Sequence, residues 1–63
     1  MEILKIGSSG TLVQYLQSTL KLLGFYKGNI DGIFGNQTRQ AVIIFQREFG
    51  IAQDGIIRAK LLE

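Results

Sequence analysis

The stretch from Tyr26 to Thr38, YKGNIDGIFGNQT, decides how this chain folds, because it packs three glycines and one aspartate into thirteen residues between two helical patterns. Asp31 and Gly32 form a turn pair: the carboxylate accepts hydrogen bonds from backbone N–H groups ahead of it, and the glycine tolerates a positive φ. Gly28 and Gly35 are expected to allow two further reversals. The stretch is therefore predicted to be an ordered connector.

The apolar side chains of this connector, Ile30, Ile33 and Phe34, are predicted to point back under the helices and to fill part of the core. Two functional interpretations fit the composition poorly. A phosphate-binding loop normally carries Lys-Ser/Thr or follows a strand, and neither is present. A calcium loop needs several alternating carboxylates and a closing glutamate, which Asn29 and Asp31 alone do not supply.

Helical patterns flank the connector on both sides. Over Thr11–Leu23 apolar residues recur at helical spacing, and Gly24 is expected to end the helix in a left-handed conformation. A second pattern runs from about Asn36 to Phe49, with Gly50 as its terminator. The predicted core residues of the two helices are Leu12, Val13, Leu16, Leu20, Leu23, Thr38, Ala41, Val42, Phe45 and Phe49.

The ends of these helices complete the predicted architecture. Ser8 or Ser9 is the expected N-cap of the first helix and Asn36 that of the second. The closing stretch Ile56–Leu62 is predicted to form a short helix or turn. Residues 1–63 are therefore expected to be one all-α domain: a small three-helix bundle with an ordered Gly-rich loop between helices 1 and 2 and a short third helix.

The two halves of the chain show a weak internal repeat. Each has a glutamine on the helix, a glycine stop, a loop and an Asp-Gly turn, with Gln17 preceding Asp31-Gly32 and Gln46 preceding Asp54-Gly55. The glutamines are expected to bond nearby backbone, although Gln46 also has an interpretation as a ligand contact. The repeat fits either a duplication or the same local turn and helix-stop interactions arising separately in each half.

Taken together, these residues form the ordered pattern VxxLQxxLxxLGFYxGxxDGxFGxxTxxAVxxFQxxxGIxxDG, which starts at Val13. The pattern resembles the three-helix peptidoglycan-binding domain often attached to bacterial and phage cell-wall hydrolases, over Gly10 to Ile57. This resemblance implies a non-catalytic anchor on peptidoglycan, with a hydrolase domain as partner. It also implies a place at the cell envelope, outside the cell, or in a phage lysis protein.

The sequence departs from the family near its end. The family usually has a glycine, then threonine and an aromatic residue, where this chain has Arg58 and Leu61-Leu62. The last helix is therefore expected to be shortened. The start of the chain has no apolar segment typical of a secretory signal, and no run approaches the length of a membrane span.

Catalysis is not expected from these side chains. With no His and no Cys, a serine triad or a zinc site lacks its usual groups. A glycosidase pair would have to be Asp31 with Asp54, and both are expected to be used in turns. The net charge of +2 is spread along the chain, which argues against nucleic acid. We therefore expect a non-enzyme with no cofactor and no metal.

Binding then has to use hydrogen bonds, stacking and shape. Tyr26 suits a sugar or a peptide edge, or else packs over the first helix. Asn29 offers a donor and an acceptor, or else serves the turn. Arg39 suits a stem-peptide carboxylate, or else is a solvated charge. Arg39, Ile43 and Gln46 form an i, i+4, i+7 line, and a groove between that line and the loop is the predicted site.

Four apolar residues lie off the core stripes: Tyr15, Leu22, Ile43 and Ile44. Scattered surface apolar residues are normal, but joined ones would form a patch for a neighbouring domain or for a homo-oligomer. The alternative function is therefore a protein-interaction or self-association module on the same helical scaffold. A helix-turn-helix DNA binder is disfavoured, since the second helix offers only two arginines among isoleucines.

Overall fold

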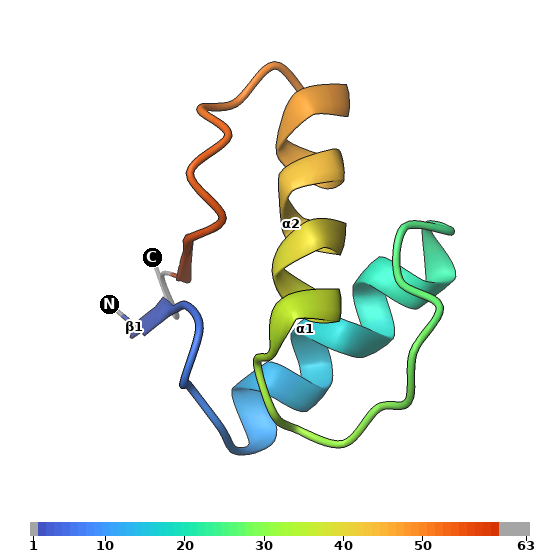
Figure 1. Ribbon diagram of the computed structural model, residues 1–63, viewed down its shortest axis with the longest axis vertical. Coiled ribbons are helices and arrows are strands. Elements are labelled where there is room, and N and C mark those ends of the chain that lie inside the picture. The colour runs from blue at the N-terminus through green and yellow to red at the C-terminus, as the bar shows by residue number, and fades with distance from the viewer. Residues whose placement is uncertain (1, 60–63) are drawn as a thin grey trace.

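The computed structural model describes residues 2–59 and contains two helices and a pair of short strands. In chain order the elements are β1 (Glu2–Leu4), α1 (Thr11–Leu22), α2 (Asn36–Glu48) and β2 (Ile57–Ala59). The helices cross, with the α1–α2 loop on one side of α2 and the segment after α2 on the other (Figure 1). That segment returns the chain to the N-terminal strand, where β2 pairs with β1 in an antiparallel register.

Both helices confirm the predicted ranges to within a residue, because their stop signals act as expected. Gly24 and Gly50 follow the C-caps with φ of +88° and +69°, a conformation that costs glycine little. After α1 the N–H of Phe25 donates to the Leu20 carbonyl, and after α2 the N–H of Ile51 donates to the Gln46 carbonyl. This arrangement satisfies carbonyls that a helix end otherwise leaves open.

The predicted side-chain N-caps are wrong. Gly10 precedes α1 and Gly35 precedes α2, and neither helix start carries a side-chain cap hydrogen bond. The Ser8 hydroxyl instead accepts from the backbone N–H of Lys5 at 3.1 Å. The backbone of residues 7–10 pairs with the α1–α2 loop, including the bridge between Ser9 and Ile33. The serines therefore fix the entry to α1 through backbone pairing.

The predicted third helix is wrong over residues 57–59, which form β2. Ile57 lies opposite Leu4 of β1, and Leu4 is buried in the core. A β-branched residue suits this half-buried strand, whereas a helix so short gains too little from its own hydrogen bonds. Leu61-Leu62 of the predicted helix lie outside the described residues. The fold is thus mostly helical, with an antiparallel strand pair closing it.

The buried residues confirm the middle of the apolar stripe predicted for each helix, but the last residue predicted for each stripe is exposed. The buried apolar residues are Leu4, Val13, Leu20, Tyr26, Phe34, Ala41 and Val42. Leu23 and Phe49 are exposed because each helix ends before them, so they follow the cap and not the helical face. In the loop only Phe34 turns inward as predicted, whereas Ile30 and Ile33 are exposed.

The loop glycines have different roles from one another. Gly32 adopts a φ of +73° and confirms the predicted turn. Gly28 and Gly35 do not provide positive-φ reversals, which corrects their assignment, and Gly35 is extended at −104°. A Cβ at Gly28 would lie 2.8 Å from the Tyr26 hydroxyl and 2.7 Å from the Gln37 amide oxygen. Gly28 is therefore required by close packing.

Candidate functional site

One buried glutamine holds the Gly-rich loop against α1. The Gln17 Oε1 accepts from the backbone N–H of Gly32 at 2.9 Å. Its Nε2 donates to Asp31 Oδ1 at 3.1 Å and to the Ile33 carbonyl at 3.0 Å. Asp31 Oδ1 also accepts from the Ile33 N–H at 3.0 Å, which confirms the predicted Asx-type turn. The loop is therefore shaped by a side chain that comes from α1.

The second half of the chain repeats this set of glutamine hydrogen bonds, which we call a glutamine clamp. The Gln46 Oε1 accepts from the Gly55 N–H at 3.0 Å, and its Nε2 donates to Asp54 Oδ1 at 3.1 Å and to the Ile56 carbonyl at 2.9 Å. Gln46 is buried and its amide is fully used by these bonds. Its interpretation as a backbone-bonding residue is confirmed, and the structure removes it from the candidate ligand contacts.

The two turn aspartates remain ionised by their hydrogen bonds. The N–H of Ile33, followed by the amide of Gln17, holds the pKa of Asp31 below its ordinary value. The N–H of Ile56 does the same for the pKa of Asp54, with smaller contributions from Gln46 and from Arg58. Neither carboxyl is therefore prepared to donate a proton, as a general acid must.

Tyr26 does not offer an open ring face to a ligand. Only 5% of it is exposed, and its hydroxyl donates to the Asn29 carbonyl at 2.6 Å. The Gln17 Nε2 approaches the same hydroxyl at 3.4 Å and the Thr38 hydroxyl at 3.0 Å. Tyr26 is packed, which agrees with the second of its two interpretations, and Thr38 is a buried partner of Gln17. The side chain of Asn29 is exposed.

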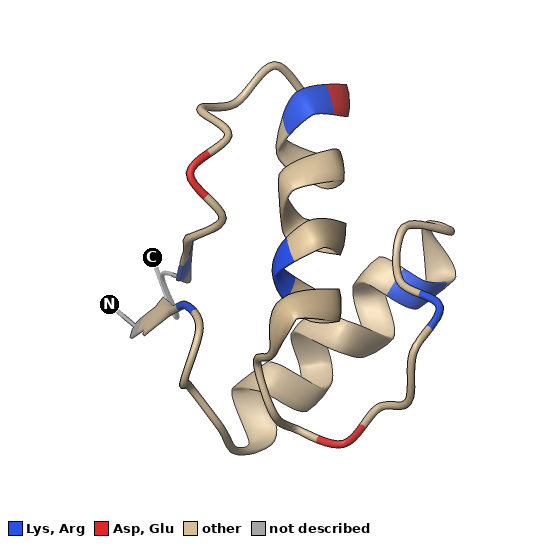
Figure 2. Cartoon of the chain, in the orientation of Figure 1, with Lys and Arg blue, Asp and Glu red and all other residues tan. Residues whose placement is uncertain are grey.

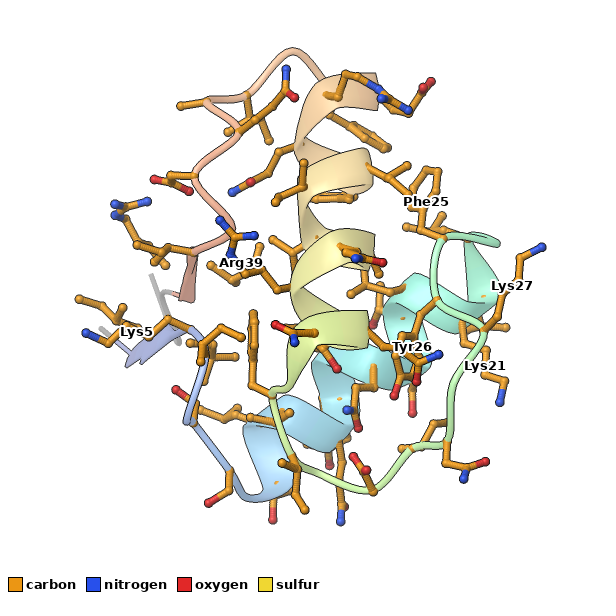
Figure 3. All side chains as sticks on the ribbon, in the orientation of Figure 1. Lys5, Lys21, Phe25, Tyr26, Lys27 and Arg39 are labelled. Atoms are coloured by element: carbon orange, nitrogen blue, oxygen red, sulfur yellow. The ribbon has the colours of Figure 1, made fainter. Side chains whose placement is uncertain are left out.

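The predicted line Arg39–Ile43–Gln46 does not border a groove with the loop. Arg39 and Tyr26 lie on opposite sides of α2 (Figure 3). The Arg39 side chain lies over Gly55, so that a Cβ there would approach its Cγ and Nε at 3.1 Å. Gln46 bonds the same returning segment, and Ile43 is half-buried. Arg39 is exposed, but it lies on the side of α2 that faces away from the loop.

Two adjoining hollows lie instead on the loop side of α2, and both are lined by Tyr26 and Gln37. The first has a volume of about 270 Å³ and the second about 240 Å³. We call them together the loop groove. Its other lining residues are Phe25, Lys27, Asp31, Ile33, Gly35, Asn36, Thr38, Gln40, Ala41 and Ile44.

The loop groove combines amide side chains with one charged residue in each hollow. Asn36, Gln37 and Gln40 are exposed on α2 and supply donors and acceptors. Asp31 lines the first hollow and Lys27 the second, and Figure 2 shows one acidic and one basic segment along the α1–α2 loop. The N–H groups at the start of α2 carry a partial positive charge, and no acidic residue in the first turn of the helix compensates it.

Sequence reasoning missed these three amides. Their only signal is the spacing of Asn36, Gln37 and Gln40 over about one turn directly after the loop, off the stripe of Arg39 and Gln46. Amide side chains are common on solvated helix faces, so the pattern becomes informative only when the loop is seen beside it.

The four off-stripe apolar residues do not share a surface. Tyr15 and Leu22 are exposed on α1 and line separate hollows, whereas Ile44 lines the loop groove and Ile43 is half-buried. A homo-oligomer through these residues remains a prediction. Over residues 2–59 there is no helix long and apolar enough to cross a membrane, and no cluster of three metal-binding side chains.

Comparison with known proteins gives a consistent family. The family described as "Putative peptidoglycan binding domain" matches residues 9–63. The spore cortex-lytic enzyme of Bacillus cereus is 46% identical over 59 residues, covering 94% of this chain and 23% of that enzyme. The N-acetylmuramoyl-L-alanine amidase CwlM of Mycobacterium tuberculosis is 53% identical over 47 residues, covering 75% of this chain and 12% of that protein.

Solved structures agree with the sequence relatives. The SleB N-terminal domain has a TM-score of 0.90 and 45% identity, covering 92% of this chain and 80% of that one. The endolysin of the Burkholderia phage AP3 has a TM-score of 0.82 and 42% identity, covering 87% and 21% respectively. The chain thus spans less than a quarter of the two whole-length relatives named above.

Proposed function

Because this chain belongs to the peptidoglycan-binding domain family, we propose that it binds peptidoglycan without cutting it and holds a hydrolase on that polymer. Its relatives are named as lytic enzymes and amidases, yet the chain matches only 23% and 12% of two of them. One neighbour is an N-terminal domain solved on its own. The matched part is the binding domain of these proteins, and it is not an enzyme.

We place the binding surface at the loop groove. The observation that carries this placement is a continuous hollow surface lined by three exposed amides, Asn36, Gln37 and Gln40, beside a loop held rigid by hydrogen bonds. A rigid surface loses little entropy when a polymer binds to it. The exposed Asn29 lies in the same loop and extends this surface. Arg39 and Ile43 lie elsewhere and are a separate, weaker candidate contact.

Co-sedimentation with purified cell-wall sacculi tests the function and the surface together. The wild-type chain is expected to sediment with sacculi. The double variant Gln37→Ala, Gln40→Ala is expected to bind more weakly, because two donor–acceptor side chains are removed from the groove. Gln53→Ala is the matched control, since Gln53 is an exposed glutamine in the segment after α2.

The outcomes separate the two parts of the proposal. Wild-type chain that stays in the supernatant contradicts peptidoglycan binding. Wild-type binding with an unaffected double variant contradicts the loop groove and directs attention to Arg39. Circular dichroism of each variant shows that the helices are retained.

We further propose that the protein acts where its relatives' names place them, at the cell wall or the spore cortex, or in phage lysis. Fractionation of cells that express the chain with an epitope tag, followed by immunoblotting of the wall fraction, tests this location. Recovery of the tagged chain only in other fractions, while a known wall protein is found in the wall, contradicts it.

A further inference from the structure

The aromatic residues that line the loop groove are wholly or partly buried. Of its two aromatic residues, Tyr26 is buried and Phe25 is half-buried, with an edge-to-face contact to Phe45 at a ring-centroid distance of 6.3 Å. The exposed aromatic residues of residues 2–59, Tyr15 and Phe49, do not line the groove. Sugar rings usually pack on an open aromatic face, and no fully exposed aromatic residue of residues 2–59 lines the groove.

The polar groups of the groove match a peptide better than a sugar strand. The amide side chains of Asn36, Gln37 and Gln40 each present one acceptor and two donors, which is the pattern that a backbone N–H and C=O pair requires. Ile33 and Ile44 supply apolar contacts of the size that alanine methyl groups need. The groove therefore offers both polar and apolar contacts to a peptide.

The two hollows of the groove carry opposite charges that are available to a ligand, Asp31 in the first and Lys27 in the second. Asp31 uses Oδ1 in the turn, whereas its Oδ2 has no hydrogen-bond partner within residues 2–59. The ammonium of Lys27 has no ion-pair partner among the same residues, and Figure 3 shows it extending into solvent. A neutral glycan gains nothing from two separated charges, whereas a ligand with an ammonium and a carboxylate gains from both.

We infer that the loop groove recognises the stem peptide of peptidoglycan, with a ligand ammonium at Asp31 and a ligand carboxylate at Lys27. An uncross-linked stem peptide carries both groups, on its diamino residue and its acidic residues. This inference rests on the proposed function and adds which part of the polymer is bound.

Two preparations of sacculi separate the inference from the proposed function. Intact sacculi are compared with stripped sacculi, which are the glycan strands left after an amidase has removed the stem peptides. Because these strands lose their cross-links and dissolve, they are coupled to beads before sedimentation. Binding to intact sacculi and its loss from stripped sacculi is the expected result. Equal binding to both overturns the inference and leaves the proposed function standing, whereas no binding to intact sacculi refutes the proposed function itself.

Soluble probes and charge variants refine this test. The tripeptide L-Ala-γ-D-Glu-meso-diaminopimelate is expected to compete with intact sacculi, and the peptide-free disaccharide is not. Lys27→Glu is expected to weaken tripeptide binding roughly two- to fivefold, as for an exposed ion pair. Lys5→Glu is the control, because this substitution makes the same charge change at a lysine on the opposite side of the molecule (Figure 3). Equal effects of the two variants overturn the placement of the carboxylate.

Discussion

Replacement of Gln17 with methionine tests how the Gly-rich loop is held, because methionine keeps the length and volume of the side chain but removes its amide. In the native fold the Gln17 Oε1 accepts from the Gly32 N–H at 2.9 Å. Its Nε2 lies within 3.1 Å of oxygens of Asp31, Ile33 and Thr38. The substitution therefore removes every polar contact between α1 and the turn that this side chain makes.

The expected loss of free energy of unfolding depends on which partners water can reach. Gly32 is buried, so its N–H loses its acceptor at a cost of about 1–3 kcal/mol. The Ile33 carbonyl belongs to an exposed residue, and its lost bond costs about 0.5–1.5 kcal/mol. The Asp31 carboxylate is open to water and adds no cost, whereas the buried Thr38 hydroxyl loses a partner at about 0.5–1.5 kcal/mol. The loss is roughly 2–6 kcal/mol, against about 3–9 kcal/mol for a domain of this length.

Urea unfolding followed by circular dichroism measures this loss as a lower midpoint at an unchanged slope. Gln46→Met is expected to lose less than Gln17→Met, because Gln46 makes the same clamp without the buried hydroxyl partners. Gln40→Met is the control, since Gln40 is exposed on α2 and the change should stay within about 0.5 kcal/mol. A loss for Gln17→Met no larger than that of the control would refute the role of the clamp.

Three further outcomes follow from the packing and the charges, each read from urea unfolding. Gly28→Ala should cost about 1–3 kcal/mol, since its Cβ would press on a buried tyrosine hydroxyl. Gly35→Ala meets open space and should cost less, about 0.5–1 kcal/mol, because alanine is a poorer N-cap of α2 than glycine. Leu4→Ala should cost about 2–4 kcal/mol and its exposed neighbour in β1 far less; equal losses would deny β1 a place in the core. Asp31 and Asp54 have lowered pKa values in the folded protein, so they stabilise the fold above the ordinary value of 3.8. That contribution is lost as the pH falls through the folded pKa, and a midpoint that does not fall on acidification would contradict this.

The helices and the Asp-Gly turns could be predicted from the sequence because local physics determines them. Apolar spacing fixes the buried face of each helix, and Gly24 and Gly50 end the helices without help from distant residues. Asp31 bonds an N–H only two residues ahead, so its turn is also local. The role of Gln17 followed from its place in the repeat.

The remaining features depend on contacts between distant residues. The stretch after Ile56 is apolar enough for a helix or a strand, and only the presence of Glu2–Leu4 beside it selects the strand. The sequence also leaves open which side of α2 the returning segment covers. Because that segment covers the side of Arg39 and Gln46, the exposed surface beside the loop belongs to other residues, including Gln37.

The paired glutamine clamps also affect the chemical stability of the backbone at the two Asp-Gly sequences. Asp-Gly sequences age by attack of the glycine nitrogen on the preceding side-chain carboxyl, which expels water and leaves a cyclic imide that reopens as isoaspartate. Here the hydrogens on the nitrogens of Gly32 and Gly55 are directed at glutamine oxygens 2.9 and 3.0 Å away. Each nitrogen is thereby withheld from its neighbouring carboxyl. The side chains that shape both corners therefore slow the covalent decay of the most vulnerable bonds in the chain.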